Sequence, residues 1–323
     1  MDSLVPELLD LADDADAVAR ARAAIAEDPA ALLRCAATIA RMGQVPSPTL
    51  RTAAAAEIDR IERLEPSLVR ELLTEMLVEK HVHLALEWLH QVGFLARLLP
   101  ELAATVDFSQ ESDRRHKDVW EHTKLVVRQA VPRLQVRWAA LLHDIGKVPT
   151  RTFLPDGKVH FHGHAEVGAR MFDPIARRFA FDRPARAQIR FLVLHHLRAS
   201  QYSASWTDSA VRRFDKEMGE ALEDLLDLSR ADITSRRPGR RAELLQQIHA
   251  LSTRILQLRA LDARQPPLPT GLGTDISARF GIPPSRKIGD IKRALEEAVE
   301  RGELEERRES AYYLDWIAKS GLV

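Results

Sequence analysis

Three histidines stand within five residues, at His160, His162 and His164, inside the segment PDGKVHFHGHAEVGAR. Imidazole is a frequent metal ligand and proton carrier, so this density indicates chemistry. Strand-like alternation would place His160 and His162 on one side of the chain. Gly163 would free the backbone to turn, so that His164 begins the next helix. The cluster is therefore interpreted as one rim of a metal site.

A second candidate is the adjacent pair His143 and Asp144, which ends the apolar stretch 136–145. Such a pair alone is more often a core histidine beside a satisfied neighbour than a set of ligands. The pattern recurs, however. His122 stands three residues after Val119 and four before Val126, which places it on the apolar face of its own helix.

Two more helical stretches end in ionisable groups. His195 and His196 end the stretch IRFLVLHH at 189–196, and Asp232 continues the stripe that Leu225 and Leu228 begin. Two buried aspartates among several imidazoles need a counter-charge, because burying an unpaired carboxylate costs several kcal/mol. We therefore expect one or two divalent ions. Ligands without thiolate favour Mn, Fe, Co, Ni or Mg over a structural zinc ion.

The elements that must position these groups are almost all helical. Apolar residues three and four apart predict helices over 67–80, 82–99, 119–131, 136–145, 184–197, 221–232 and 242–261. Asp28 before Pro29 and Ser47 before Pro48 predict two further helix starts. We expect an all-α fold with one short hairpin near 150–161, where Pro155, Asp156 and Gly157 supply the turn.

Composition sets outer limits. The net charge is zero, so no global field attracts nucleic acid or membrane. Cys35 is the single cysteine, no cationic stretch followed by an apolar one opens the chain, and no apolar run approaches the roughly 20 residues that span a bilayer. We expect a cytoplasmic protein with no membrane association. Pro- and Gly-rich residues at 264–275 and a break near 107–118 divide it into 1–112, 113–262 and 263–323.

The order His122, His143-Asp144, Asp232 resembles the signature of the HD-domain metal-dependent phosphohydrolases. This resemblance implies an HD helical bundle, with His122, His143, Asp144 and Asp232 as ligands of a first ion. It also implies that His164, His195 and His196 complete a second site, as in family members with two ions. Lys147 falls where the family places a lysine that faces the substrate phosphate.

Several segments are similar, more narrowly, to the neck, HD and tail regions of bacterial CCA-adding enzymes: RHKDVWEHTKLV, RWAALLHDIGKVPTR, HGHAEVGA, WTDSAVRRF and RADITSR. The likeness covers roughly residues 24–300, so 1–112 would be a neck-like helical body and 263–323 a helical tail. Two departures matter. The nucleotidyltransferase head is expected to be missing, and the base-reading arginine of the neck motif is replaced by Ala31 in Glu27-Asp28-Pro29-Ala30-Ala31.

The resemblance implies hydrolysis of phosphoesters of nucleotides or RNA 3′ ends, including 2′,3′-cyclic phosphates, by metal-activated water. Asp144, Lys147 and Arg198 are the expected catalytic residues. Lys147, His162, Arg198 and Arg236 are the expected contacts to substrate, with tRNA as a candidate partner. His162 could equally be a plain surface residue. Two alternatives stay open: a non-catalytic tRNA- or RNA-binding module, and a split-off part of a tRNA nucleotidyltransferase.

Overall fold

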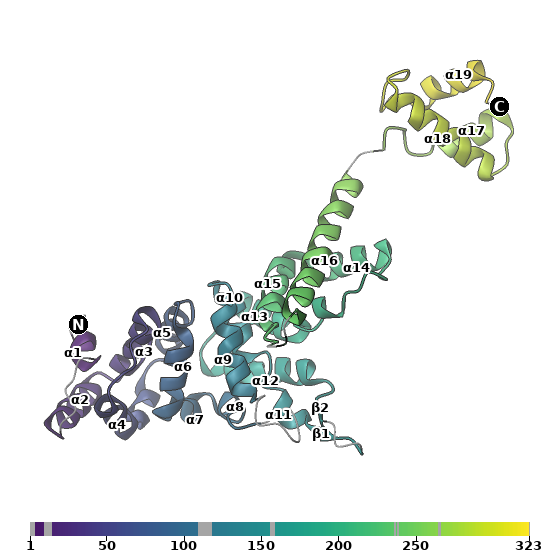
Figure 1. Ribbon diagram of the computed structural model, residues 1–323. Coiled ribbons are helices and arrows are strands. Elements are labelled where there is room, and N and C mark those ends of the chain that lie inside the picture. Colours follow the sequence, from purple (N-terminus) through teal and green to yellow (C-terminus); the bar gives the residue numbers. More distant parts are fainter. Residues whose placement is uncertain are drawn as a thin grey trace. The chain divides into compact units, whose positions relative to one another are not determined.

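In a computed structural model the regular elements are helices apart from one short hairpin, which confirms the all-α expectation (Figure 1). The structure describes residues 4–9, 15–108, 118–155, 159–235, 237, 239–263 and 266–322. Over these residues the only sheet is two-stranded. None of the helices found in them is long and apolar enough to cross a membrane.

Contacts divide the chain into two compact units, residues 1–255 and 256–323. The second unit contains α17 (Leu272–Phe280), α18 (Arg286–Glu300) and α19 (Ser310–Ser320). Its core includes the buried residues Leu272, Ile276, Leu295 and Tyr313. The expected division after residues 112 and 262 stays a prediction, and the first of these boundaries lies outside the described residues.

The first unit begins with a body of helices that pack on one another, α2 on α4 and α3 on α5 and α6. Ser47 caps α4 as predicted, since its side chain accepts a hydrogen bond from the Leu50 amide. Asp28 accepts one from the Ala30 amide at the start of α3. The elements are α1 (Leu4–Leu9), α2 (Ala15–Glu27), α3 (Ala30–Met42), α4 (Pro48–Ala56), η1 (Ile58–Arg63), α5 (Pro66–Leu77), α6 (Val82–Gln91), α7 (Phe94–Leu98) and α8 (Pro100–Ala103).

One predicted helix is divided. The stretch 82–99 forms α6 and α7 rather than one continuous helix, because Gly93 adopts a left-handed conformation with φ of 88° between them. A residue with a side chain rarely adopts this conformation, whereas glycine does so without steric cost.

The rest of the first unit surrounds α10, which packs against α9, α13, α15 and α5. Every residue of α10 from Val136 to Leu142 is buried, including Arg137. The Arg137 guanidinium donates to the carbonyl oxygen of Leu77 at 2.9 Å. The elements are α9 (Val119–Gln129), α10 (Leu134–Leu142), α11 (Lys147–Thr150), α12 (His164–Arg178), α13 (Arg183–His195), η2 (Ala199–Gln201), α14 (Asp208–Met218), η3 (Gly219–Ala221), α15 (Leu222–Asp232) and α16 (Arg240–Ala263), whose last residues belong to the second unit.

The expected hairpin is present. Strands β1 (Thr152–Phe153) and β2 (Val159–His160) are antiparallel, with Thr152 opposite His160 and Phe153 opposite Val159. The predicted turn residues Asp156 and Gly157 lie outside the described residues. After β2, Gly163 has φ of 72°, and α12 begins at His164 as its sequence position predicted.

Candidate metal centre

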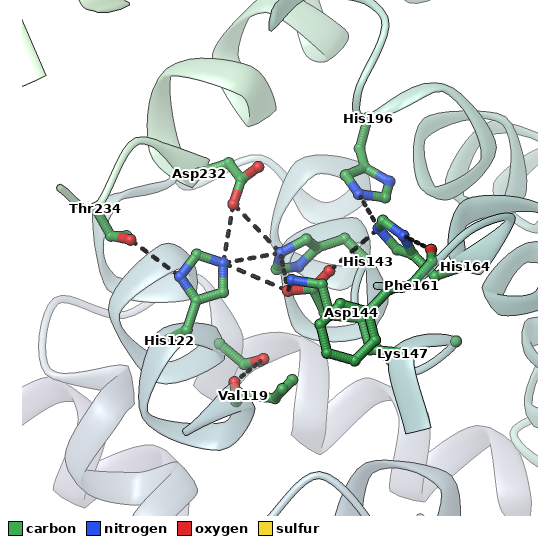
Figure 2. A network of polar contacts seen from close by, with 12 residues as sticks. Val119, His122, His143, Asp144, Lys147, Phe161, His164, His196, Asp232 and Thr234 are labelled. Carbon is green, nitrogen blue, oxygen red and sulfur yellow. Dashed lines mark hydrogen bonds and ion pairs between the residues drawn. The ribbon is translucent and has the colours of Figure 1, made fainter. Parts of the chain in front are cut away.

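Six of the expected ligands meet where the ends of the helices around α10 come together (Figure 2). Most stand at or just beyond a helix end. The elements that place them are distant in sequence: α9, α13 and α15 pack on α10, and α12 packs on α13. The six are His122 in α9, His143 and Asp144 directly after α10, His164 at the start of α12, His196 directly after α13 and Asp232 at the end of α15.

The first group comprises His122, His143 and Asp232. Oδ1 of Asp232 lies 2.9 Å from Nε2 of His122 and 3.4 Å from Nε2 of His143. The two nitrogens are 3.3 Å apart. Oδ2 of Asp144 lies 3.5 Å from the first nitrogen and 3.2 Å from the second. Four donor atoms from four residues thus face one another.

The second group comprises Asp144, His164 and His196, all buried. Oδ1 of Asp144 lies 3.6 Å from Nε2 of His164, which is 3.2 Å from Nε2 of His196. Asp144 therefore turns one carboxylate oxygen to each group. Figure 2 shows this carboxylate between His122, His143 and Asp232 on one side and His164 and His196 on the other.

The outer ring nitrogens determine which nitrogen of each imidazole carries the proton. The Nδ1 atoms of His143, His164 and His196 lie 2.9, 2.9 and 2.7 Å from the carbonyl oxygen three residues before each. A carbonyl only accepts, so Nδ1 donates, and in the neutral ring the lone pair lies on Nε2. All three Nε2 atoms point into the two groups. A carbonyl partner that orients the ring in this way is typical of metal-binding histidines.

In the first group, the charged side chains shift one another's pKa values. Burial alone would lower the pKa of His143, but the Asp144 and Asp232 carboxylates outweigh it and raise that pKa to about 10. Burial alone would raise the pKa of Asp144, yet the neighbouring His143 and Lys147 cations hold it well below its usual value. The pKa of Asp232 is likewise held low, against burial, by hydrogen bonds from His122 and His143.

The second group behaves differently. Burial and the nearby His143 charge lower the pKa of His196 to about 4, and burial lowers the pKa of His164. Both rings are therefore neutral near pH 7 and available as nitrogen donors. The donors of both groups are imidazole nitrogen and carboxylate oxygen. The single thiol, Cys35, is buried in α3 and belongs to neither group. This donor set fits a divalent cation of borderline or hard character.

His195 belongs to neither group, although it was expected among the ligands. Its ring lies against Phe191, with centroids 4.3 Å apart. Consecutive residues at a helix end point about 100° apart, and of this pair only His196 faces the second group. The sequence could not distinguish the two, and the structure places His196 inward.

Three of the four residues expected to contact substrate lie in the described part of the chain. Lys147 donates from Nζ to Oδ2 of Asp144 at 2.7 Å. Arg198 pairs with Glu217 at 2.6 Å. His162 is exposed, and its ring lies 5.2 Å from that of His160. Arg236 lies outside the described residues.

A cavity of about 430 Å³ opens beside the second group. His164 of that group is part of its wall, together with His162, Arg198 and Gln201. Its volume is within the range of small-molecule sites. His162 and Arg198, which were expected to contact substrate, therefore line the same cavity as His164, a candidate metal-binding residue.

Two contacts that support the candidate ligands could hardly be predicted from the sequence. The Oγ1 atom of Thr234 lies 3.0 Å from Nδ1 of His122, but only its position two residues after Asp232 connects it with the site. Gly146 lies so close to α12 that a Cβ atom there would stand 2.6 Å from the Gly168 amide nitrogen and closer still to the His164 carbonyl oxygen. Both features fix candidate ligands in place.

Comparison with known proteins agrees with the motifs. Residues 115–237 match the HD domain family. The chain is 34% identical over 241 residues to the A-adding tRNA nucleotidyltransferase of Deinococcus radiodurans, an alignment that covers 72% of this chain and 54% of that protein. It is 31% identical over 257 residues to the CC-adding tRNA nucleotidyltransferase of Thermus thermophilus, covering 77% and 56%.

The chain therefore spans about half the length of these relatives. The crystal structure of the Bacillus stearothermophilus CCA-adding enzyme in complex with CTP is similar with a TM-score of 0.46 and 16% identity, over 93% of this chain and 64% of that one. A similarity of this degree supports no conclusion about the function of this chain. The sequence matches confirm the expected HD domain and the expected homology.

Proposed function

From the premise that this chain carries an HD domain and is homologous over 72% of its length to a tRNA nucleotidyltransferase, we propose that it is a metal-dependent phosphohydrolase. Its proposed substrates are phosphoesters of nucleotides or of RNA ends, 2′,3′-cyclic phosphates among them. One observation carries the proposal: the Nε2 atoms of His143, His164 and His196 point inward around Asp144 while each Nδ1 is held by a carbonyl.

The residues fit one or two divalent cations. His122, His143, Asp232 and Oδ2 of Asp144 would hold one, and His164, His196 and Oδ1 of Asp144 the other. Mn, Fe, Co, Ni and Mg are the candidates that suit these donors. A divalent cation in such a site polarises a phosphoryl oxygen and lowers the pKa of water, which is the chemistry that phosphoester hydrolysis requires.

The cationic side chains are proposed to contact the substrate. Lys147 lies 2.7 Å from Asp144 and can offset charge that develops on the phosphoryl oxygens. Arg198 is at the wall of the cavity, where a substrate phosphate can take the place of Glu217 as its partner. His162, exposed on the same wall, is proposed to contact the substrate. Arg236 is retained as a candidate on sequence grounds alone.

The names of the relatives support the choice of RNA ends, since those proteins are tRNA nucleotidyltransferases. Nucleotide addition by this chain is not proposed. The buried methyl group of Ala31 offers no hydrogen-bond donor where the family's neck motif has an arginine. A non-catalytic tRNA- or RNA-binding module is the competing hypothesis, because the same two groups would also hold the helices together around a structural ion.

The test is metal analysis of the purified protein, followed by hydrolysis assays with each candidate metal. The substrates are 2′,3′-cyclic nucleotides, terminal phosphomonoesters and an RNA oligonucleotide with a 2′,3′-cyclic end. We expect Asp144→Asn to lose more than about 100-fold in kcat/KM, because even the outer contacts of metal ligands are worth about 10- to 100-fold. Asp208→Asn is the matched control, since Asp208 is an exposed carboxylate paired with Arg254 on α14 and α16.

If the metal-loaded protein and Asp144→Asn give equal rates on every substrate, the phosphohydrolase proposal is wrong. If both proteins then still bind RNA, the result would favour the hypothesis of a non-catalytic RNA-binding module.

A further inference from the structure

A line of two cations and three aromatic rings extends from the metal centre to the hairpin. Nζ of Lys147 lies 5.7 Å from the ring centroid of Phe161, and Figure 2 shows the two side by side. The Phe161 ring is 6.3 Å from that of Phe108. The Arg151 guanidinium carbon lies 4.2 Å from the Phe108 centroid and 5.3 Å from the Phe153 centroid. We call these five residues the aromatic–cationic strip.

The outer end of the strip is open to solvent. Phe153 is 62% exposed, although it belongs to a strand of only two residues that buries neither of its side chains. Arg151 is also exposed, and with described residues it forms no ion pair. A single exposed phenylalanine needs no explanation. Phe153, however, lies against Arg151, which pairs with no described carboxylate, and both residues continue a line that begins at Lys147. This combination requires an explanation.

The inner end of the strip joins the metal centre at two points. Lys147 is bonded to Asp144, the carboxylate shared by both groups. Phe161 provides the carbonyl oxygen that holds His164, and it also contributes to the wall of the cavity. A molecule lying along the strip would therefore have its end beside the candidate ligands.

We infer that the strip binds a single-stranded RNA segment and leads its 3′ end into the metal centre. Bases stack on exposed aromatic rings and on arginine planes, and every base offers such a face. Phosphates between the bases need cations, which Arg151 and Lys147 supply. This inference rests on the proposed function and narrows it, because it makes an oligonucleotide end, rather than a free nucleotide, the preferred substrate.

Unpaired RNA is favoured over duplex by the same contacts. Bases in a duplex are stacked on one another and cannot stack on Phe153 or Phe108, whereas unpaired bases can. The zero net charge of the chain gives no general attraction to nucleic acid, so binding must depend on local cations such as these. The competing explanation is that the strip only ties the hairpin to the rest of the first unit.

The experiment uses the full chain and the variants Phe153→Ala and Phe153→Trp. Leu154→Ala is the matched control, because Leu154 is the next residue, is 39% exposed, and is not one of the five residues of the strip. One arm measures binding of a fluorescently labelled single-stranded RNA of about ten nucleotides by anisotropy, without added metal. The other compares kcat/KM for an RNA with a 2′,3′-cyclic end and for a 2′,3′-cyclic mononucleotide.

We expect Phe153→Ala to weaken RNA binding about tenfold, the size of one lost base-stacking contact, and Phe153→Trp to retain it. The ratio of oligonucleotide to mononucleotide kcat/KM should fall by a similar factor. Leu154→Ala should match the wild type in both arms. Duplex RNA of the same sequence should not compete.

Wild-type protein that binds no single-stranded RNA, or binds duplex equally well, would overturn the inference. So would an equal loss in Phe153→Ala and Leu154→Ala, which would indicate a purely structural hairpin. Because the binding arm needs no catalysis, failure of the phosphohydrolase proposal alone removes the substrate preference and leaves the RNA-binding role of the strip standing.

Discussion

The Nε2 atoms of His164 and His196 face each other at 3.2 Å, while the Nδ1 atom of each ring donates to a backbone carbonyl. With the proton on Nδ1, each neutral ring directs a lone pair at the other in a buried space. Two facing lone pairs repel, and a cation between them converts that repulsion into attraction. We therefore expect metal binding to stabilise the fold.

The first prediction follows from this arrangement. Chelation should lower the melting temperature, and a metal present at 100 times its Kd should raise the free energy of unfolding by about 2.7 kcal/mol. His196→Ala should reduce this response, because it removes one donor of the second group. His160→Ala should retain it, since His160 belongs to neither group. Thermal unfolding with and without metal measures the response of each variant. An unchanged response in His196→Ala would show that the second group holds no ion.

The second prediction concerns Gly146. Its φ of −69° suits any residue, so a side chain is excluded by space alone. A Cβ atom there would press on the start of α12, which places His164. Gly146→Ala should cost about 1–3 kcal/mol of stability, the usual range for overpacking, and weaken metal binding.

Gly289→Ala is the control, because no atom lies within 4 Å of a Cβ at that helical position. It should leave metal binding unchanged and stabilise its helix by about 0.5–1 kcal/mol. Urea unfolding and a metal titration measure the two effects. A folded Gly146→Ala protein with wild-type metal affinity would show that the contact with α12 does not position His164.

The third prediction uses pH. Asp173 of α12 accepts hydrogen bonds from Arg186 at 2.7 Å and Arg190 at 3.4 Å, both on α13. Burial alone would raise the pKa of Asp173, but these hydrogen bonds and charges hold it below its usual value. The pairing therefore contributes stability above the unfolded-state pKa of about 3.9 and loses it as pH falls through the lower folded-state pKa.

Asp173→Asn should accordingly cost on the order of 1 kcal/mol at pH 7, as partly exposed ion pairs do, and progressively less below about pH 4. Urea unfolding at a series of pH values provides the test. Arg186→Gln should add little in the Asp173→Asn background, which a double-mutant cycle would check. A cost that stays constant to pH 2 would exclude the carboxylate charge as its origin.

Much of the site could be predicted from sequence because its ligands obey helical spacing. His122 shares a face with Val119 and Val126, and His143 with Asp144 ends a helix that is buried on all sides. Local periodicity determines which side chains point inward. It does not determine which of two adjacent residues at a helix end does so, and for that reason His195 was expected beside His196.

Other contacts do not follow from the spacing of residues within one helix. Arg34 pairs with Asp28 one turn past Ala31, so the carboxylate of the neck motif has an arginine partner that the motif's spacing does not indicate. Nor does any periodicity connect Arg151 with Phe108, which lie 43 positions apart. Such pairs depend on how helices pack, which a single sequence constrains only weakly.

The last prediction separates the two groups by stoichiometry. Asp144 turns Oδ2 to the first group and Oδ1 to the second, whereas Asp232 contacts only the first. Asp144→Asn should therefore weaken both metal sites, Asp232→Asn the first alone, and His196→Ala the second alone.

Metal content per chain after dialysis, measured by mass spectrometry, should fall furthest in Asp144→Asn. If the protein holds two ions, Asp232→Asn and His196→Ala should each keep one, and their double variant should resemble Asp144→Asn. If it holds a single ion in the first group, His196→Ala should keep the full content. Equal content in Asp144→Asn and Asp232→Asn, with two ions in the wild type, would show that Asp144 does not bridge, because a carboxylate shared by two cations cannot be lost without affecting both.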